Sequence, residues 1–487
     1  MRALRPALAA LVLAGCGAPL TTVEAPARVE RSAPEPMRTT PPQPGPAPSL
    51  RLPEPERRVL DNGLRVVYVA RPALPIVHAT LVTRGGTSDD PAAAPGLADF
   101  VADLMDEGAG GRSALELAAA FEALGASVGV RSGWDAVQVD LEVLRPRLGE
   151  ALALMADVVA RPDFPANEIE RKREELLTEL ARARDEARAI AGNAFASLVF
   201  GDVHPYGRLA TRETASAITR ERMVAFHRAF VRPNGATLIL VGDVTAGGAH
   251  AMVDAAFKDW ERGTLAPPVA PASSPGGPTT LYLVDKPGAP QSEIRIGHPG
   301  VARDHPDYFP LLVLNTILGG SFTSRLNTNL REVHGYSYGA RSSFAMLRGA
   351  GAFQASAAVV SEKTDSSVVE FFREIERIRS EAVPPAELER AKSYVALGLP
   401  RRFETTGGVA GQLADLAVYG IDEDFYERYV ARVMAVTATD VGRVAREFLR
   451  PDRSVVVVVG DRETIEQGLR DLEMGPVEIR TVEEFVR

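Results

Sequence analysis

The sequence contains a single cysteine, Cys16, among 487 residues, so an internal disulfide is excluded. Histidine is scarce as well, and no two of the seven histidines lie closer together than seven residues. A pair of histidines one helical turn apart is the usual way in which a helix binds zinc. Because no such pair is present, zincin-type catalysis in its usual form is excluded.

Positive charge is also limited, with 55 Lys and Arg against 64 Asp and Glu and a net charge of −9. Such a chain has no overall attraction for phosphate backbones, so we expect no nucleic-acid partner. The content of 45% apolar and 24% charged residues is typical of a soluble globular protein and excludes disorder as the main state.

No long apolar run is present at the N-terminus. The run 7–14 follows two arginines and is too short to span a bilayer, so it predicts a signal peptide. The residues Leu-Ala-Gly before Cys16 resemble a bacterial lipobox, in which the cysteine becomes the lipidated first residue. A plain secretory signal is the alternative. We expect residues 1–16 to be a lipoprotein signal that anchors the chain in the bacterial cell envelope, facing the periplasm.

A proline-rich linker follows over residues 17–56, with eleven prolines between positions 19 and 55. Such a segment cannot pack a core and prefers extended conformations. We therefore expect it to be a spacer between the lipid and a folded body that begins near Arg57.

The folded body repeats itself. Residues 230–243 align with residues 448–461 at an offset of 218, and residues 168–171 align with residues 387–390 at an offset of 219. Two matches at nearly one spacing indicate a tandem duplication. We expect an N-terminal domain over 57–263, an interdomain linker over 264–278 and a C-terminal domain over 279–487.

Each half alternates strand and helix signals. Apolar, β-branched runs predict strands over 64–69, 76–82 and 237–241, and helical spacing predicts helices over 96–107, 114–124, 146–160 and 166–190. The sequence therefore predicts an α+β fold in which each half has a sheet on one side and helices on the other.

Three segments carry a family resemblance. Residues 96–105 read Gly-Leu-Ala-Asp-Phe-Val-Ala-Asp-Leu-Met, and segments 200–208 and 319–338 follow in the same order. They resemble the insulinase/pitrilysin family of metallopeptidases, in which the first segment normally reads Gly-Leu-Ala-His-Phe-x-Glu-His-Met. The resemblance covers residues 57 to 470 and implies the two-domain processing-peptidase-like fold.

The same resemblance implies a degenerate zinc motif. Asp99 and Asp103 stand where the family has its zinc-binding histidines, Ala102 stands at the general base, and Glu179 matches the distant glutamate ligand. Alanine has no proton acceptor, so general-base assistance worth about a hundred- to ten-thousand-fold is lost. We expect no peptide hydrolysis by this site alone and no metal cofactor in this chain.

Two interpretations of these carboxylates stay open. Asp99, Asp103 and Glu179 could form an oxygen cluster suited to magnesium, calcium or manganese. Alternatively, Asp99, Asp103 and Asp106 form the solvated face of an amphipathic helix, and Lys172, which replaces an auxiliary glutamate of the family, neutralises them without a metal.

The second half retains a pair that the resemblance marks as catalytic. In active family members an arginine and a tyrosine seven residues apart reach the substrate peptide, and Arg331 and Tyr338 match them. A guanidinium and a phenol can both donate hydrogen bonds to a developing oxyanion. The alternative is that Arg331 pairs with a nearby acid and Tyr338 packs on the sheet. His204, in the segment 200–208, is expected to fix a turn.

The missing zinc ligands beside an intact arginine–tyrosine pair favour a non-catalytic subunit of a heteromeric insulinase-like zinc peptidase. We expect the zinc in a homologous partner subunit, a peptide or unfolded protein as substrate, and a membrane link through the N-terminal lipid. One alternative is a peptide-binding or scaffold lipoprotein of the envelope without proteolysis. A further alternative is a hydrolase with a carboxylate-bound metal.

Overall fold

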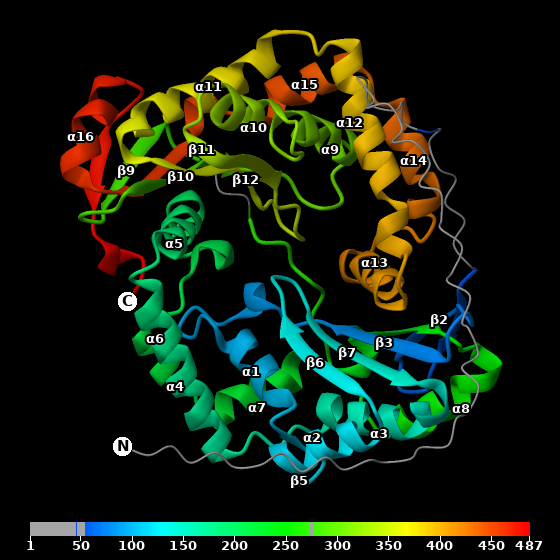
Figure 1. Cartoon of the computed structure of the whole chain (residues 1–487). Helices are drawn as coiled ribbons and strands as arrows, with labels where there is room; N and C mark the ends of the chain where they lie inside the picture. Colours follow the sequence, from blue (N-terminus) through cyan, green and yellow to red (C-terminus); the bar gives the residue numbers. More distant parts are fainter. Residues whose placement is uncertain (1–44, 46–53, 273–275) are drawn as a thin grey trace, which may run out of the picture. The chain divides into compact units, whose positions relative to one another are not determined.

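Each half of the duplicated sequence forms a six-stranded sheet in the computed structural model (Figure 1). The structure describes residue 45 and residues 54–272 and 276–487. The predicted lipobox at Cys16 and most of the predicted linker 17–56 lie outside these residues. Contacts group the described residues 54–272 and 276–487 as one compact unit, which contains both sheets.

The first sheet has the order β1-β2-β8-β3-β7-β6. Its strands are β1 (Glu56–Val59), β2 (Arg65–Ala70), β3 (Ile76–Thr83), β6 (Ser127–Ser132), β7 (Val137–Leu144) and β8 (Thr237–Gly242). The predicted strands 64–69, 76–82 and 237–241 are confirmed to within one residue at each end. All six residues of β8 are buried, because the strand lies between β2 and β3 and both faces of the sheet are covered there. This burial accounts for the apolar run over residues 238–241.

The second sheet has the order β11-β12-β10-β13-β9-β14. Its strands are β9 (Thr280–Asp285), β10 (Gln291–Pro299), β11 (Ser337–Phe344), β12 (Ala352–Val360), β13 (Val455–Gly460) and β14 (Val477–Arg480). A short hairpin of β4 (Gly108–Ala109) and β5 (Arg112–Ser113) lies outside both sheets.

The two sheets confirm the duplication. Strands β2, β8, β3, β7 and β6 correspond to β9, β13, β10, β12 and β11, with the same neighbours and the same parallel and antiparallel pairings. The halves differ at one edge, where β1 runs antiparallel to β2 but β14 runs parallel to β9.

Sixteen helices accompany the sheets in the described part of the chain. Those of the first half are α1 (Leu97–Met105), α2 (Ala114–Ala123), α3 (Leu148–Ala160), α4 (Ala166–Ala183), α5 (Ala187–Phe200), α6 (Arg212–Ser216), α7 (Arg220–Phe230) and α8 (Ala246–Phe257). Those of the second half are α9 (Tyr308–Leu318), α10 (Arg325–Asn327), α11 (Thr364–Ser380), α12 (Pro385–Gly398), α13 (Thr406–Tyr419), α14 (Phe425–Ala435), α15 (Ala438–Phe448) and α16 (Arg462–Asp471).

The halves exchange one helix each. α5 of the first half packs against β10 and β13 of the second sheet, and α13 of the second half packs against β3 and β8 of the first (Figure 1). We expected each sheet to carry helices on one side only. In the structure a helix of the other half, α5 for the second sheet and α13 for the first, also packs against each sheet.

The helix predicted over residues 166–190 is in fact two helices, and the second of them packs on the other half. The single helix expected over 166–190 is wrong, since α4 ends at Ala183 and α5 begins at Ala187. The chain turns here because Ile190, Ala194 and Phe195 of α5 bury their side chains in a cluster with valines of the second sheet. Burial of this apolar surface stabilises the turn away from α4.

Within residues 54–272 and 276–487, no helix combines the length and the apolar character needed to cross a membrane. The predicted boundaries of the two domains and of the linker 264–278 stay a prediction.

Candidate active site

Helix α1 carries the degenerate motif and is fixed at its N-terminus by Asp90. Gly96 precedes the helix with φ 89°, a left-handed conformation that glycine adopts without strain. The Asp90 carboxylate accepts hydrogen bonds from the backbone N–H groups of Gly96 at 2.7 Å and Ala98 at 2.8 Å. Burial raises the pKa of Asp90 to about 7, although these two bonds act to lower it. Sequence reasoning did not identify this residue.

The segment 200–208 contacts the loop that contains Asp90 and precedes α1. Arg208 Nη1 donates to the Asp90 carbonyl at 2.9 Å, and the buried Tyr206 lies two residues earlier in the chain. His204 Nδ1 accepts from the Tyr206 N–H at 3.1 Å, which confirms that this histidine fixes a turn.

Two of the three motif positions of α1 share the outer face of the helix, and the third faces the core. Asp99 and Asp103 are exposed, whereas Ala102 is fully buried in the first hydrophobic core. Although the residue is exposed, the surrounding protein removes part of the water from the Asp99 carboxyl group and raises its pKa, and a hydrogen bond with Ser132 opposes this rise. The apolar residues of α1 are all buried, which agrees with the interpretation of Asp99 and Asp103 as the polar face of an amphipathic helix.

Ion pairs join the end of α1 to α4. Arg171 Nη2 lies 2.6 Å from Glu107 Oε1, and Lys172 Nζ lies 3.5 Å from the same oxygen and 3.4 Å from Glu175 Oε2. The ammonium of Lys172 also acts to lower the pKa of Asp103. Lys172 therefore forms its ion pairs with Glu107 and Glu175 and not with the three aspartates of the predicted polar face, although its charge reaches Asp103 and Asp106.

Asp99, Asp103 and Glu179, which the sequence suggested as an oxygen cluster, lie on α1 and α4. Glu179 is exposed on α4. Partial desolvation of the Asp103 carboxyl raises its pKa, and the charge of Glu179 adds to this rise. Among the residues that the structure describes, no group of three or more histidine, cysteine, aspartate or glutamate side chains is placed to hold a metal ion. Asp99, Asp103 and Glu179 do not form such a group.

Arg331 lies in a π-helical segment, η5 (Thr328–Val333), that ends just before β11. Its guanidinium carbon is 4.6 Å from the centre of the Phe322 ring, and its Nε is 3.3 Å from Glu332 Oε1. The expected alternative of a nearby acid as its partner is thus confirmed. The Arg331 side chain is still 38% exposed.

Tyr338 lies at the start of β11 and is 90% exposed. The alternative that it packs on the sheet is therefore wrong. The strand behind it is held in place, since the buried Asn327 accepts a hydrogen bond from the Ala340 N–H at 3.1 Å. A phenol in this position is free to donate a hydrogen bond to another molecule.

A second residue that sequence reasoning missed is Asp135, in the turn between β6 and β7. Its carboxylate is almost fully buried and accepts from the Arg348 backbone N–H at 2.9 Å, which joins the two halves. No motif marks it, because its partner is 213 residues away in the sequence.

Family models match two parts of the chain. Residues 65–202 match the model described as insulinase (peptidase family M16), and residues 217–395 match the model described as the peptidase M16 inactive domain. An uncharacterised zinc protease of Mycobacterium tuberculosis is 28% identical over 425 residues, which cover 85% of this chain and 96% of the relative. One of Streptomyces coelicolor is 25% identical and covers 84% and 90% of the two chains.

Solved structures share the fold. A peptidase M16 inactive domain from Pseudomonas fluorescens superposes with a TM-score of 0.78 at 24% identity, over 84% of this chain and 98% of that one. A protease from Helicobacter pylori gives a TM-score of 0.77 at 20% identity, over 84% and 100% of the chains.

Proposed function

Because the chain belongs to the insulinase family of peptidases, we propose that it is the non-catalytic subunit of a heteromeric zinc peptidase. In this proposal a homologous partner chain carries the zinc, and the present chain contributes Arg331 and Tyr338 to the binding of a peptide substrate.

The residues of α1 do not fit a zinc site of this family. The two imidazoles are replaced by Asp99 and Asp103, and neither forms a metal-binding group in the described part of the chain. The position of the general base is occupied by Ala102, whose methyl group is fully buried in the core. A side chain without a lone pair cannot accept a proton from an attacking water.

The second half supplies hydrogen-bond donors for a peptide substrate. The proposal rests mainly on the exposure of Tyr338. Its phenol is 90% exposed, although it stands on a well-anchored strand. Arg331 is held over Phe322 with part of its guanidinium exposed. Both groups can donate hydrogen bonds to a carbonyl oxygen that gains negative charge, and such donors act most strongly where water is excluded. Closure of a partner chain over them provides that exclusion.

Co-expression with a homologue that contains His-x-x-Glu-His tests the proposal. We expect a complex with peptidase activity that falls by about tenfold or more in Arg331→Ala or Tyr338→Phe. The matched controls are Arg390→Ala and Tyr394→Phe on α12, where both residues are exposed, and these retain activity. Equal activity of the Arg331→Ala, Tyr338→Phe and control complexes would refute the proposed role.

The same preparation separates the alternatives. A peptide-binding or scaffold protein binds unfolded peptide as an isolated chain and forms no complex with a zinc-bearing homologue. A hydrolase with a carboxylate-bound metal contains stoichiometric metal, and Asp103→Ala removes it.

We also propose that Cys16 is lipidated and anchors the protein in the cell envelope, on the basis of the short apolar run and the Leu-Ala-Gly-Cys sequence. Labelling with a fatty acid in a bacterial host should mark the wild-type chain and not Cys16→Ser. Equal labelling of both chains would exclude this anchor.

A further inference from the structure

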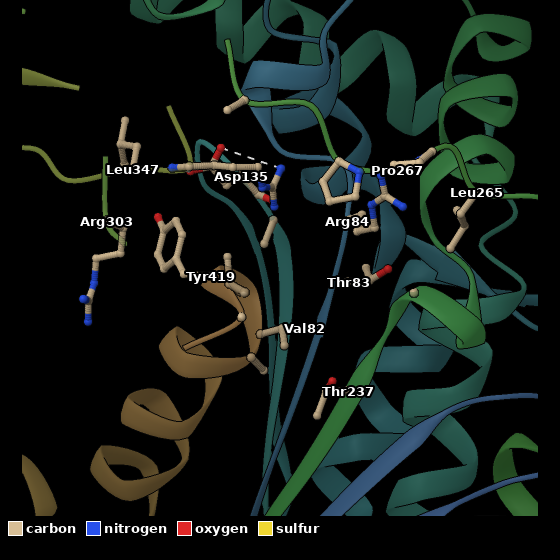
Figure 2. Close-up of a pocket in the computed structure, with 18 of the residues that line it drawn as sticks. Val82, Thr83, Arg84, Asp135, Thr237, Leu265, Pro267, Arg303, Leu347 and Tyr419 are labelled. Atoms are coloured by element: carbon tan, nitrogen blue, oxygen red, sulfur yellow. Dashed lines mark hydrogen bonds and ion pairs between the residues drawn. The ribbon is translucent and has the colours of Figure 1, made fainter. Parts of the chain in front are cut away.

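A cavity of about 650 Å³ lies between the two halves, beside the segment that joins them. Its walls come from the ends of β2, β3 and β8, from residues 265–270, from two loops of the second half, and from the end of α13. Figure 2 shows Arg84 and Pro267 on one side of this cavity and Arg303 and Tyr419 on the other.

The charges around the cavity are unequal. Four arginines and two aspartates line it, so the formal charge of the wall is 4 − 2 = +2. The arginines are Arg65, Arg84, Arg303 and Arg348, and the aspartates are Asp135 and Asp304. Arg65 and Arg84 belong to the first half, whereas Arg303 and Arg348 belong to the second.

Two of the arginines have acidic partners. Arg348 Nη1 lies 3.8 Å from Asp135 Oδ1, Arg348 Nη2 donates to the Asp135 carbonyl at 2.9 Å, and the Arg348 backbone N–H donates to the Asp135 carboxylate. Arg303 Nη2 lies 2.9 Å from Asp415 Oδ2, and its guanidinium carbon is 4.3 Å from the centre of the Tyr308 ring. These charges are compensated within the protein.

The other two arginines have no acid within ion-pair distance among the described residues. Arg65 Nε donates to the neutral hydroxyl of Thr237 at 3.1 Å. The pKa of Arg84 is lowered by burial and by the charge of Arg348, and the charge of Asp89 opposes this only in part. The charges of Arg84 and Arg348 are thus close enough to interact, and Arg65 and Arg84 line the same cavity without a carboxylate at ion-pair distance among the described residues.

We propose that this cavity binds a small polyvalent oxyanion, phosphate-type or carboxylate, through Arg84 and Arg65 with support from Arg348. Guanidinium groups bind such oxygens with paired, charge-assisted hydrogen bonds, and a multivalent ion offers oxygens to more than one of them. This site is separate from Arg331, Tyr338 and the proposed peptidase partnership.

Calorimetric titration of the purified chain with pyrophosphate and with citrate, at an ionic strength held constant with NaCl, tests the proposal. We expect the Kd of the bound anion to rise by about tenfold or more in Arg84→Ala, and to stay unchanged in Arg453→Ala, which removes an exposed arginine outside the cavity. Binding of pyrophosphate alone indicates a phosphate-type ligand, and binding of both indicates a general site for polyvalent oxyanions.

Arg65→Ala provides a second test if Arg84→Ala does not fold, and it should also weaken binding. Arg84→Lys should retain part of the affinity, because it keeps the charge and loses the paired hydrogen bonds. No binding of either anion beyond that of NaCl, or equal binding by wild type, Arg84→Ala and Arg65→Ala, would overturn the proposal.

Discussion

Replacement of Asp135 by alanine should destabilise the contact between the two halves more than most single substitutions. The Asp135 side chain is 1% exposed and lies within hydrogen-bonding reach of groups from both halves. Its carboxylate accepts from the Arg348 backbone N–H, and it also interacts with the hydroxyls of Tyr206 and Tyr419. Tyr206 in turn accepts from the Gly349 N–H at 3.1 Å.

The magnitude follows from what the substitution leaves behind. Removal of one partner of a buried charge pair costs about 3–5 kcal/mol, since the other charge loses its compensation. The Arg348 side chain is 16% exposed, so water compensates part of this loss and the lower end of the range applies. Asp135→Asn keeps an acceptor without the charge and should cost about 1–3 kcal/mol.

Urea-induced unfolding, followed by circular dichroism, gives the free energy of unfolding of each variant. Asp452→Ala is the control, because this aspartate is 65% exposed and its removal should change the free energy by less than about 0.5 kcal/mol. Arg348→Ala and the double variant complete a cycle whose coupling energy should exceed about 0.5 kcal/mol. A loss below about 1 kcal/mol in Asp135→Ala would refute the reasoning.

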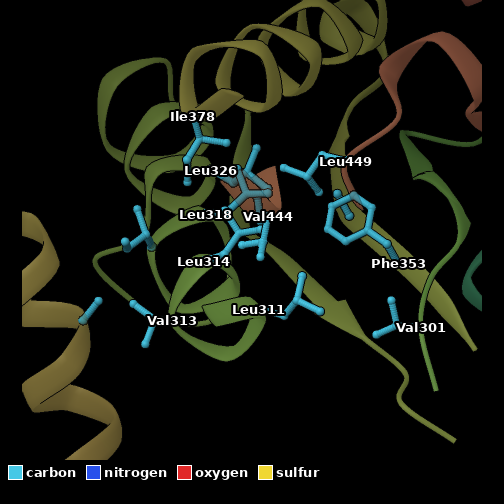
Figure 3. Packing of buried hydrophobic residues seen from close by; sticks show 14 of the residues in the cluster. Val301, Leu311, Val313, Leu314, Leu318, Leu326, Phe353, Ile378, Val444 and Leu449 are labelled. Carbon is cyan, nitrogen blue, oxygen red and sulfur yellow. The ribbon is translucent and has the colours of Figure 1, made fainter. Parts of the chain in front are cut away.

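Three further predictions follow from single side chains. Burial lowers the pKa of His298 to about 4, and its Nε2 accepts a hydrogen bond from the Arg450 backbone N–H. The folded state therefore favours the neutral ring. The protein loses stability as the pH falls from 6.5 towards 4, because the unfolded chain binds the proton more readily. His298→Gln should reduce the fall in unfolding free energy between pH 7 and pH 4.5 by about 2 kcal/mol, measured by urea titration at each pH. Leu314 is fully buried in the second core (Figure 3), and Leu314→Ala should cost about 2–5 kcal/mol in the same assay. Lys172→Ala should cost at most about 1 kcal/mol, because its ion pairs are partly exposed; a larger loss would contradict this assignment.

The strands of the first sheet were predictable where the sequence carries unbroken apolar runs. Thr237–Gly242 is an example, because a strand buried on both faces needs apolar residues throughout. The end of α4 at Ala183 was not predictable, since residues 184–186 contain neither glycine nor proline and the next helix continues the helical pattern. The turn depends on packing of α5 against the second sheet, which no local pattern records.

The candidate site was predictable to a similar extent. The substitutions at Asp99, Ala102 and Asp103 are visible in the sequence because the motif around them is intact. The sequence favoured an accessible Arg331 and Tyr338, but the stacking of Arg331 on Phe322 depends on the path of the chain before β11, which no local pattern records. Asp90 was not predictable from the sequence, because its partners are the backbone N–H groups of Gly96 and Ala98, and such partners do not depend on the identity of a side chain.

The most direct measurement is hydrolysis of an unstructured peptide by the homogeneous single chain supplied with zinc. The burial of Ala102 in the core and the absence of imidazoles on α1 predict no cleavage above the rate without protein, with or without a chelator. Zinc-dependent turnover that the chelator abolishes, in a preparation free of any other chain, would contradict the account.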